Sequence, residues 1–171
     1  SHSANPRSTV ATITEIYDYL RVLFARAGIP YCPKCGNEIQ KLTKEEIVNA
    51  ILAFRKSRSK AKELVVLAPV VRGRKGEYYQ MLYDFLNAGF TEVRIDGALH
   101  SLRDRIELSR YKAHTIELLI DRLPMNLDFR SKENRLRLAE AVEHALKHGH
   151  ELVTARGGER ELSLSARFTC P

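Results

Sequence analysis

The chain has 171 residues, of which 44% are hydrophobic and 29% charged, a balance that suits one folded domain with a helical appendage. No apolar run approaches the roughly 18 residues of a membrane-spanning helix, and an odd cysteine count without a signal peptide favours a reducing compartment. The formal net charge of +7 favours an acidic partner, either nucleic acid or an acidic protein face.

The N-terminal region predicts one amphipathic helix. Residues 1–4 have the character of a cloning remnant and are set aside. A 3.6-residue apolar stripe begins at a capping box formed by Thr12 and Glu15 and ends at Gly28. So strong a stripe requires a second surface that buries it.

The helix is followed by Cys32-Pro33-Lys34-Cys35-Gly36, the usual pattern of a zinc knuckle. Cys170 offers a third thiolate, and because structural zinc takes four ligands we expect the fourth beyond Pro171. Two alternatives stay open: a redox pair formed by Cys32 and Cys35, and three unrelated reduced thiols. Redox pairs favour a strand-to-helix junction, which this pair lacks.

A second capping box, Thr43 to Glu46, opens another helix, and the basic stretch 55–62 is interpreted as a flexible connector. The expected organisation has three parts after the remnant. They are residues 5–62 (helix, zinc knuckle and connecting helix), 63–165 (partner-binding domain) and 166–171 (a return strand into a truncated second knuckle).

Residues 63–165 predict an α+β fold, a mixed and largely antiparallel sheet with helices packed on one face. The first strand is expected at 63–68, with residues 69–76 departing from it. The other expected elements are a helix from 78 to 86, strands at 90–96 and 114–123, a helix at 133–148 and a hairpin within 151–165.

No catalytic motif is present. The sequence contains no P-loop, no His-Glu-x-x-His and no Gly-x-Ser-x-Gly, and His144 with His148 has no carboxylate at the spacing of a metal site. Basic residues do occur on or beside the strands, and an arginine fork fits a carboxylate or a phosphate. These residues are Arg72, Arg74, Lys75, Arg94 and Arg122. Ordinary exposed charge remains the alternative for each.

The stretch from Asn5 to Arg21, Asn-Pro-Arg-Ser-Thr-Val-Ala-Thr-Ile-Thr-Glu-Ile-Tyr-Asp-Tyr-Leu-Arg, followed by the cysteine knuckle, resembles the UvrA family. This family comprises the damage-recognition ATPases of bacterial nucleotide excision repair. Ala11 stands where the family usually has glycine. Later landmarks follow in the family's order: Leu67-Ala68-Pro69, Arg74-Lys75-Gly76, Arg94-Ile95-Asp96-Gly97, Lys112 to Arg122 and Phe168-x-Cys170-Pro171.

The resemblance implies an insertion of the first ATP-binding domain that docks the helicase-like partner UvrB. The transcription-repair coupling factor would use the same surface. It implies UvrB contacts at Arg74 and Arg122, with Lys75 and Asp121 as neighbours, and a zinc site at Cys32, Cys35 and Cys170, incomplete or empty in this chain.

The resemblance also separates this chain from its parent. ATP hydrolysis, DNA binding and homodimerisation would belong to the parent protein in the bacterial cytoplasm. The chain itself would be non-catalytic, because the Walker motifs lie outside it. We also expect it to be a monomer without a membrane segment.

Two rival functions remain. The first is a basic zinc-knuckle module that grips DNA phosphates, although few aromatic residues interleave with the basic connector. The second is a stand-alone redox protein, which requires Cys32 and Cys35 to cycle. A salt titration separates phosphate binding from protein docking, because phosphate contacts weaken steeply with salt.

Overall fold

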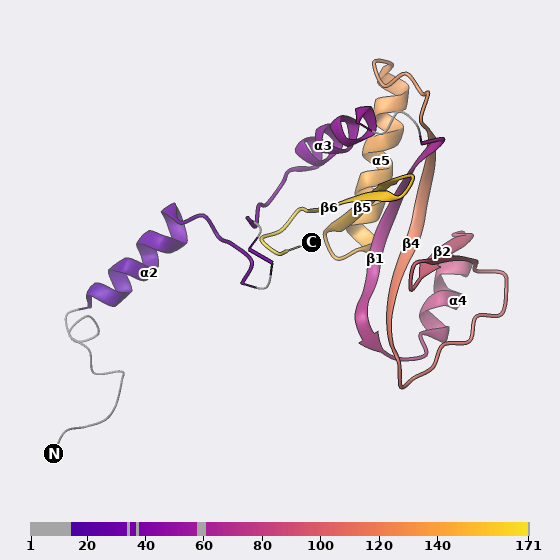
Figure 1. The fold of residues 1–171 in the computed structure, drawn as a ribbon, viewed down its shortest axis with the longest axis horizontal. Coiled ribbons are helices and arrows are strands. Elements are labelled where there is room, and N and C mark those ends of the chain that lie inside the picture. Colours follow the sequence, from indigo (N-terminus) through magenta and orange to yellow (C-terminus); the bar gives the residue numbers. More distant parts are fainter. Residues whose placement is uncertain (1–14, 34, 37, 58–60, 171) are drawn as a thin grey trace. The chain divides into compact units, whose positions relative to one another are not determined.

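The computed structural model describes residues 15–33, 35–36, 38–57 and 61–170 (Figure 1). The chain forms two compact units, one made of residues up to Ile39 together with Cys170, and the other running from Gln40 to Thr169. In this described part, no helix combines the length and the apolar composition needed to cross a lipid bilayer.

The first unit contains α2 (Ile16–Ala27), which confirms the predicted helix over these residues. It ends at Gly28, whose N–H donates to the carbonyl oxygen of Phe24 at 2.9 Å. The expected capping hydroxyl of Thr12 lies outside the described residues, and Glu15, expected inside the first turn, instead precedes the helix in a left-handed conformation with φ 59°. No residue of α2 is buried, and Phe24 is 69% exposed. The described residues therefore do not supply the surface that the apolar stripe requires.

The second unit begins with α3 (Lys44–Lys56), and its predicted capping box is confirmed. The Glu46 N–H donates to Thr43 Oγ1 at 3.3 Å, and the Thr43 N–H donates to Glu46 Oε2 at 2.7 Å. The Thr43 N–H holds the pKa of the Glu46 carboxyl below its ordinary value. Arg55, expected in the connector, lies in the last turn of α3, because its guanidinium donates to the carbonyl oxygens of Met125 and Leu127.

Six antiparallel strands form one sheet in the order β3-β2-β4-β1-β5-β6, which confirms the expected α+β class. The strands are β1 (Glu63–Lys75), β2 (Glu92–Ile95), β3 (Ala98–Ser101), β4 (Ala113–Pro124), β5 (Leu152–Gly157) and β6 (Arg160–Ser165). Helix α4 (Tyr79–Asn87) connects β1 to β2, and α5 (Lys132–His148) connects β4 to β5.

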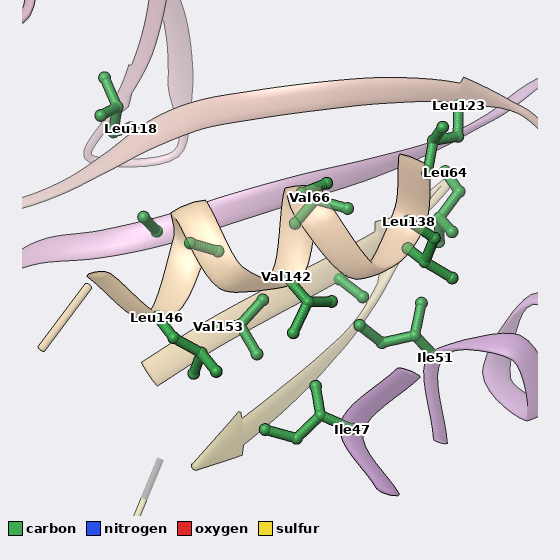
Figure 2. Packing of buried hydrophobic residues seen from close by; sticks show 14 of the residues in the cluster. Ile47, Ile51, Leu64, Val66, Leu118, Leu123, Leu138, Val142, Leu146 and Val153 are labelled. Atoms are coloured by element: carbon green, nitrogen blue, oxygen red, sulfur yellow. The ribbon is translucent and has the colours of Figure 1, made fainter. Parts of the chain in front are cut away.

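The hydrophobic core lies between one face of this sheet and the helices (Figure 2). Leu138 and Val142 of α5 are fully buried, together with Leu64 and Val66 of β1. From α3, Ile47 and Ile51 join the same cluster. Each such side chain contributes about 1.5–3 kcal/mol by leaving water. The sheet, α5 and α3 therefore share one core.

Strand β1 is longer than the sequence predicts. The departure expected at Pro69 does not occur, and the strand continues to Lys75. Proline has no N–H for a sheet ladder and is tolerated at irregularities. The β1–β4 register indeed shifts between Pro69 and Val71, and again before Arg74. A bulged strand thus replaces the predicted loop.

Candidate functional site

Two features of the described residues stand apart from the core. The first is a group of three cysteines. The sulfur atoms of Cys32, Cys35 and Cys170 all lie within 4.8 Å of one another, and the Cys35 and Cys170 sulfurs are 3.5 Å apart. The spacing prediction is borne out to this extent: the three thiols meet in one place and could bind a metal ion.

A tight backbone turn presents the two knuckle cysteines. The Gly36 N–H donates to the carbonyl oxygen of Cys32 at 2.8 Å, and Gly36 adopts φ 71°, a left-handed conformation that suits glycine. Tyr31 and Glu38 close a short antiparallel bridge around the turn. Cys32 is buried and Cys35 exposed, so the site lies at the surface.

The geometry of the trio fits a tetrahedral ion. With metal–sulfur bonds of about 2.3 Å, thiolates at the corners of a tetrahedron lie about 3.8 Å apart, close to the observed spacing. The neighbouring thiol of Cys35 raises the pKa of the Cys170 thiol to about 11, so without a cation this sulfur stays protonated. The three thiols would occupy three positions of a tetrahedral metal site and leave the fourth position for another ligand.

The second feature is the sheet face opposite the helices. Directly paired residues of neighbouring strands point to the same side. Arg122 of β4 and Arg156 of β5 both pair with Val65 of β1, and Arg156 also pairs with Glu161 of β6. We call the charged residues on this side the paired-charge face; they are Glu63, Glu92, Arg94, Glu117, Arg122, Arg156 and Glu161.

Arg94 is the buried centre of the paired-charge face. Its side chain is 8% exposed, its Nε donates to Glu117 Oε2 at 2.6 Å, and its Nη2 donates to Glu161 Oε2 at 3.1 Å. In a flat sheet, β2 and β6 would lie about 19 Å apart. The direct contact between Arg94 and Glu161 therefore requires the sheet to curve toward this face.

These contacts shift the pKa values of Glu161 and Glu117 in opposite directions. The hydrogen bond from Arg94 lowers the pKa of Glu161. Burial raises the pKa of Glu117, and the neighbouring Arg94 opposes this rise. Arg94 is thus saturated by acids of this chain and has no free fork for a ligand.

Arg122 is also occupied, although less deeply. Its Nη1 donates to Glu63 Oε1 at 2.6 Å, while its Nε and Nη2 donate to the two carboxylate oxygens of Glu92 at 3.1 and 3.0 Å. The hydrogen bond that Arg122 donates to Glu92 raises the pKa of Arg122, which therefore stays charged. Its side chain is 31% exposed. At this position two carboxylates surround one guanidinium, so the arginine lies in a locally acidic surface and not in a basic one.

A hollow of about 280 Å³ opens on the paired-charge face. Val65, Leu67 and Leu99 give it an apolar floor, and Arg122 and Arg156 stand at its rim. Arg156 is about one-third exposed, and its Nε donates to the carbonyl oxygen of Gly158 at 2.9 Å. The hollow therefore offers apolar surface beside two partly exposed guanidinium groups.

The structure separates the four residues implied for partner binding. Asp121 points to the helix side, where its carboxylate accepts from Arg137 of α5 at 2.8 and 2.9 Å. Arg74 pairs with His114 at the far end of β1. Nine residues of strand separate it from the position facing Arg122, a distance of roughly 30 Å. Lys75 lies beside Arg74 and is exposed.

Sequence reasoning missed most partners on the paired-charge face. Arg156 was assigned only to a hairpin turn, and Glu63, Glu92 and Glu161 were not singled out. The two-residue spacing of Glu92 and Arg94 places both side chains on one face of a strand, and the same spacing places Glu117 and Leu119 on one face of theirs. This alternation could have indicated which face of each strand is charged. Their meeting with Arg122 depends on register between strands, which the sequence alone does not give.

The second unit is thus an antiparallel sheet with one helix-covered face and one charged face, and the first unit carries a three-cysteine site. A family model described as the UvrA interaction domain matches residues 42–157. The chain belongs to this family.

Relatives agree with this assignment. The chain is 40% identical to UvrABC system protein A of Deinococcus radiodurans, over 99% of this chain and 17% of that protein. Its identity to UvrABC system protein A of Thermus thermophilus is 43%, again over 99% of this chain and 17% of the relative. For the protein of the same name in Mycobacterium tuberculosis it is 42%, over the whole of this chain and 17% of the relative. The chain thus spans about a sixth of the length of these relatives.

Proposed function

We propose that this chain is a docking domain for UvrB within a bacterial nucleotide excision repair protein, and that docking places UvrB at DNA lesions. The related module of the transcription-repair coupling factor would use the same surface. The observation that carries the proposal is the paired-charge face, which no described helix covers and which holds an apolar hollow between two arginines. Docking needs no catalytic group, and ATP hydrolysis would belong to other parts of the protein.

Docking at Arg122 would proceed by exchange of carboxylates. The guanidinium already has its hydrogen bonds to Glu63 and Glu92, so a partner carboxylate gains only if it replaces one of them. Glu92 is 36% exposed, so water and a partner can reach it. Arg156 offers a second guanidinium across the hollow. A partner with an acidic residue next to an apolar side chain fits this arrangement.

The other implied contacts have different roles in this proposal. A standard interface covers about 800 Å² on each partner, a patch about 32 Å across. A single interface of this size centred on the hollow extends only about 16 Å in each direction, so Arg74 and Lys75 would contact UvrB only if the interface is larger than standard, and then at its edge, where charges contribute less. Asp121 would act indirectly, because its ion pair with Arg137 holds α5 against β4.

We also propose that the three cysteines are ligands of a structural zinc ion. Zinc would tie Cys170 to the knuckle and keep the thiols deprotonated. Because the trio supplies three donors, we expect this chain to bind zinc weakly, with chelators removing it readily. Stoichiometric zinc that resists a chelator would show that a further ligand completes the site. Cys170→Ser is the variant that should abolish the remaining zinc binding.

Calorimetry of the chain against purified UvrB tests the docking proposal. We expect saturable binding that Arg122→Ala weakens strongly and Arg74→Ala weakens less. Arg110→Ala, which removes an exposed arginine outside the face, is the matched control. Absence of binding by the unaltered chain would overturn the proposal. Equal loss in Arg110→Ala would show a general charge effect in place of a docking face.

A further inference from the structure

A second charged surface lies where β1 begins and β4 ends. Two adjoining hollows of about 470 and 600 Å³ share the side chains of Arg55 and Lys56. Five cationic side chains line them, against one carboxylate, that of Asp128. We call this surface the basic shelf; its cations are Arg55, Lys56, Lys62, Arg130 and Arg135.

The floor of the basic shelf is fixed by backbone contacts. The Met125 N–H donates to the carbonyl oxygen of Lys62 at 3.0 Å, which continues the β1–β4 pairing past the last paired residues. Arg55 Nη2 donates to the carbonyl oxygens of Met125 and Leu127 at 2.6 and 2.7 Å. The guanidinium of Arg55 also lies 4.7 Å from the ring centre of Phe129. Arg55 therefore holds the shelf together.

Four other cations face solvent. Lys56, Lys62, Arg130 and Arg135 are exposed, and none forms an ion pair with another described residue. The single carboxylate, Asp128, accepts from the backbone N–H of Arg130 at 3.0 Å. Part of the net charge of +7 thus gathers here without neutralisation, unlike on the paired-charge face.

We propose that the basic shelf binds the phosphate backbone of a DNA duplex. A duplex carries about one negative charge per 1.7 Å of its axis, which suits a row of unneutralised cations. Binding to single strands would need exposed aromatic rings for stacking. The one ring that lines the shelf, Phe129, is 9% exposed and covered by Arg55. Contacts would therefore reach phosphates and carry no base sequence. The shelf adjoins the docking face at Lys62, which also lines the hollow there, whereas Lys56 and Arg130 line only the shelf.

The test uses the chain and a fluorescently labelled 24-base-pair DNA duplex at several salt concentrations. With four solvent-facing cations, the log–log salt dependence of the affinity should have a slope of about −4. In Lys56→Ala with Arg130→Ala, we expect the slope to fall to about −2 and the affinity to fall at least about tenfold at low salt. A different sequence of the same length should bind equally well.

The matched control is Arg110→Ala with Lys112→Ala, which removes the same charge from the exposed segment between β3 and β4. Retained DNA affinity in this control, with loss in the shelf variant, would support the proposal. Equal losses in both, or no binding by the unaltered chain, would overturn it. Lys62→Ala alone serves as a second, single-site check and should change the slope by about 1. Binding of UvrB should survive in the shelf variant, so the two surfaces are tested separately.

Discussion

The paired-charge face and the basic shelf lie on the same folded unit, and both carry cationic side chains, but only those of the first are neutralised by carboxylates. On the paired-charge face, Arg94 and Arg122 are bonded to glutamates of neighbouring strands. On the basic shelf, Lys56 and Arg130 have no acidic partner among the described residues. The paired-charge face therefore holds its arginines in fixed ion pairs, and the basic shelf carries an excess of positive charge that is not neutralised.

This difference teaches what each surface can recognise. Ordered ion pairs act at short range and select a partner by geometry, while unneutralised cations act over about 10 Å and respond to any polyanion. Net charge alone would have assigned both surfaces to one acidic partner. The four predictions below test whether the two surfaces really differ in this way, beginning with the largest effect.

The first prediction concerns the buried centre of the paired-charge face. Arg94→Ala leaves the carboxylate of Glu117 buried without its cation, and we expect it to lower the free energy of unfolding by about 3–5 kcal/mol. Urea denaturation measures this loss. The double change Arg94→Met with Glu117→Leu should recover much of it, because apolar groups of similar size need no partner. A loss below about 1 kcal/mol in Arg94→Ala would contradict a buried ion pair.

The second prediction concerns docking. We expect Arg122→Ala to weaken UvrB binding by about 1–4 kcal/mol, as for arginines at the centre of interfaces. Because the paired-charge face acts at short range, this loss should change little between low and moderate salt. Calorimetry at two salt concentrations gives both values. An affinity that Arg122→Ala leaves unchanged would remove this face from the docking site.

The third prediction tests whether Glu92 competes with a partner carboxylate for Arg122 or instead orients Arg122 for that partner. If Glu92 competes with a partner carboxylate for Arg122, Glu92→Gln should tighten UvrB binding by about three- to tenfold, or about 1 kcal/mol. Glu107→Gln, which alters an exposed ion pair with Arg105 elsewhere, should have no effect. Weaker binding in Glu92→Gln would mean that Glu92 orients Arg122 for its partner.

The smallest effect is a pH dependence. Arg94 holds the pKa of Glu161 below its ordinary value of 4.5. The ionised carboxylate therefore stabilises the fold above about pH 4.5, and this contribution is lost as the pH falls through the lowered pKa. The side chain is 37% exposed, so we expect at most about 1 kcal/mol. The difference in unfolding free energy between the unaltered chain and Glu161→Gln should shrink from pH 6 to pH 3. A constant difference would contradict it.

Local signals predicted most of the elements well. The capping box at Thr43 and Glu46 fixed the start of α3. Pro69 misled, because a proline signals a break unless its own strand bulges beside it, as β1 does between Pro69 and Val71. The knuckle spacing correctly predicted that Cys170 joins Cys32 and Cys35.

The sequence by itself determined the α+β class, the start of α3, the cysteine trio and, through its resemblance, the family. These follow from periodicity, caps and ligand spacing, which act over a few residues. Only the tertiary structure decided that Arg94 meets Glu161, that Arg74 and Arg122 lie roughly 30 Å apart, and that Lys56, Lys62 and Arg130 share one surface. Charge pairing depends on strand register and sheet curvature, and these are set by contacts between residues far apart in the chain.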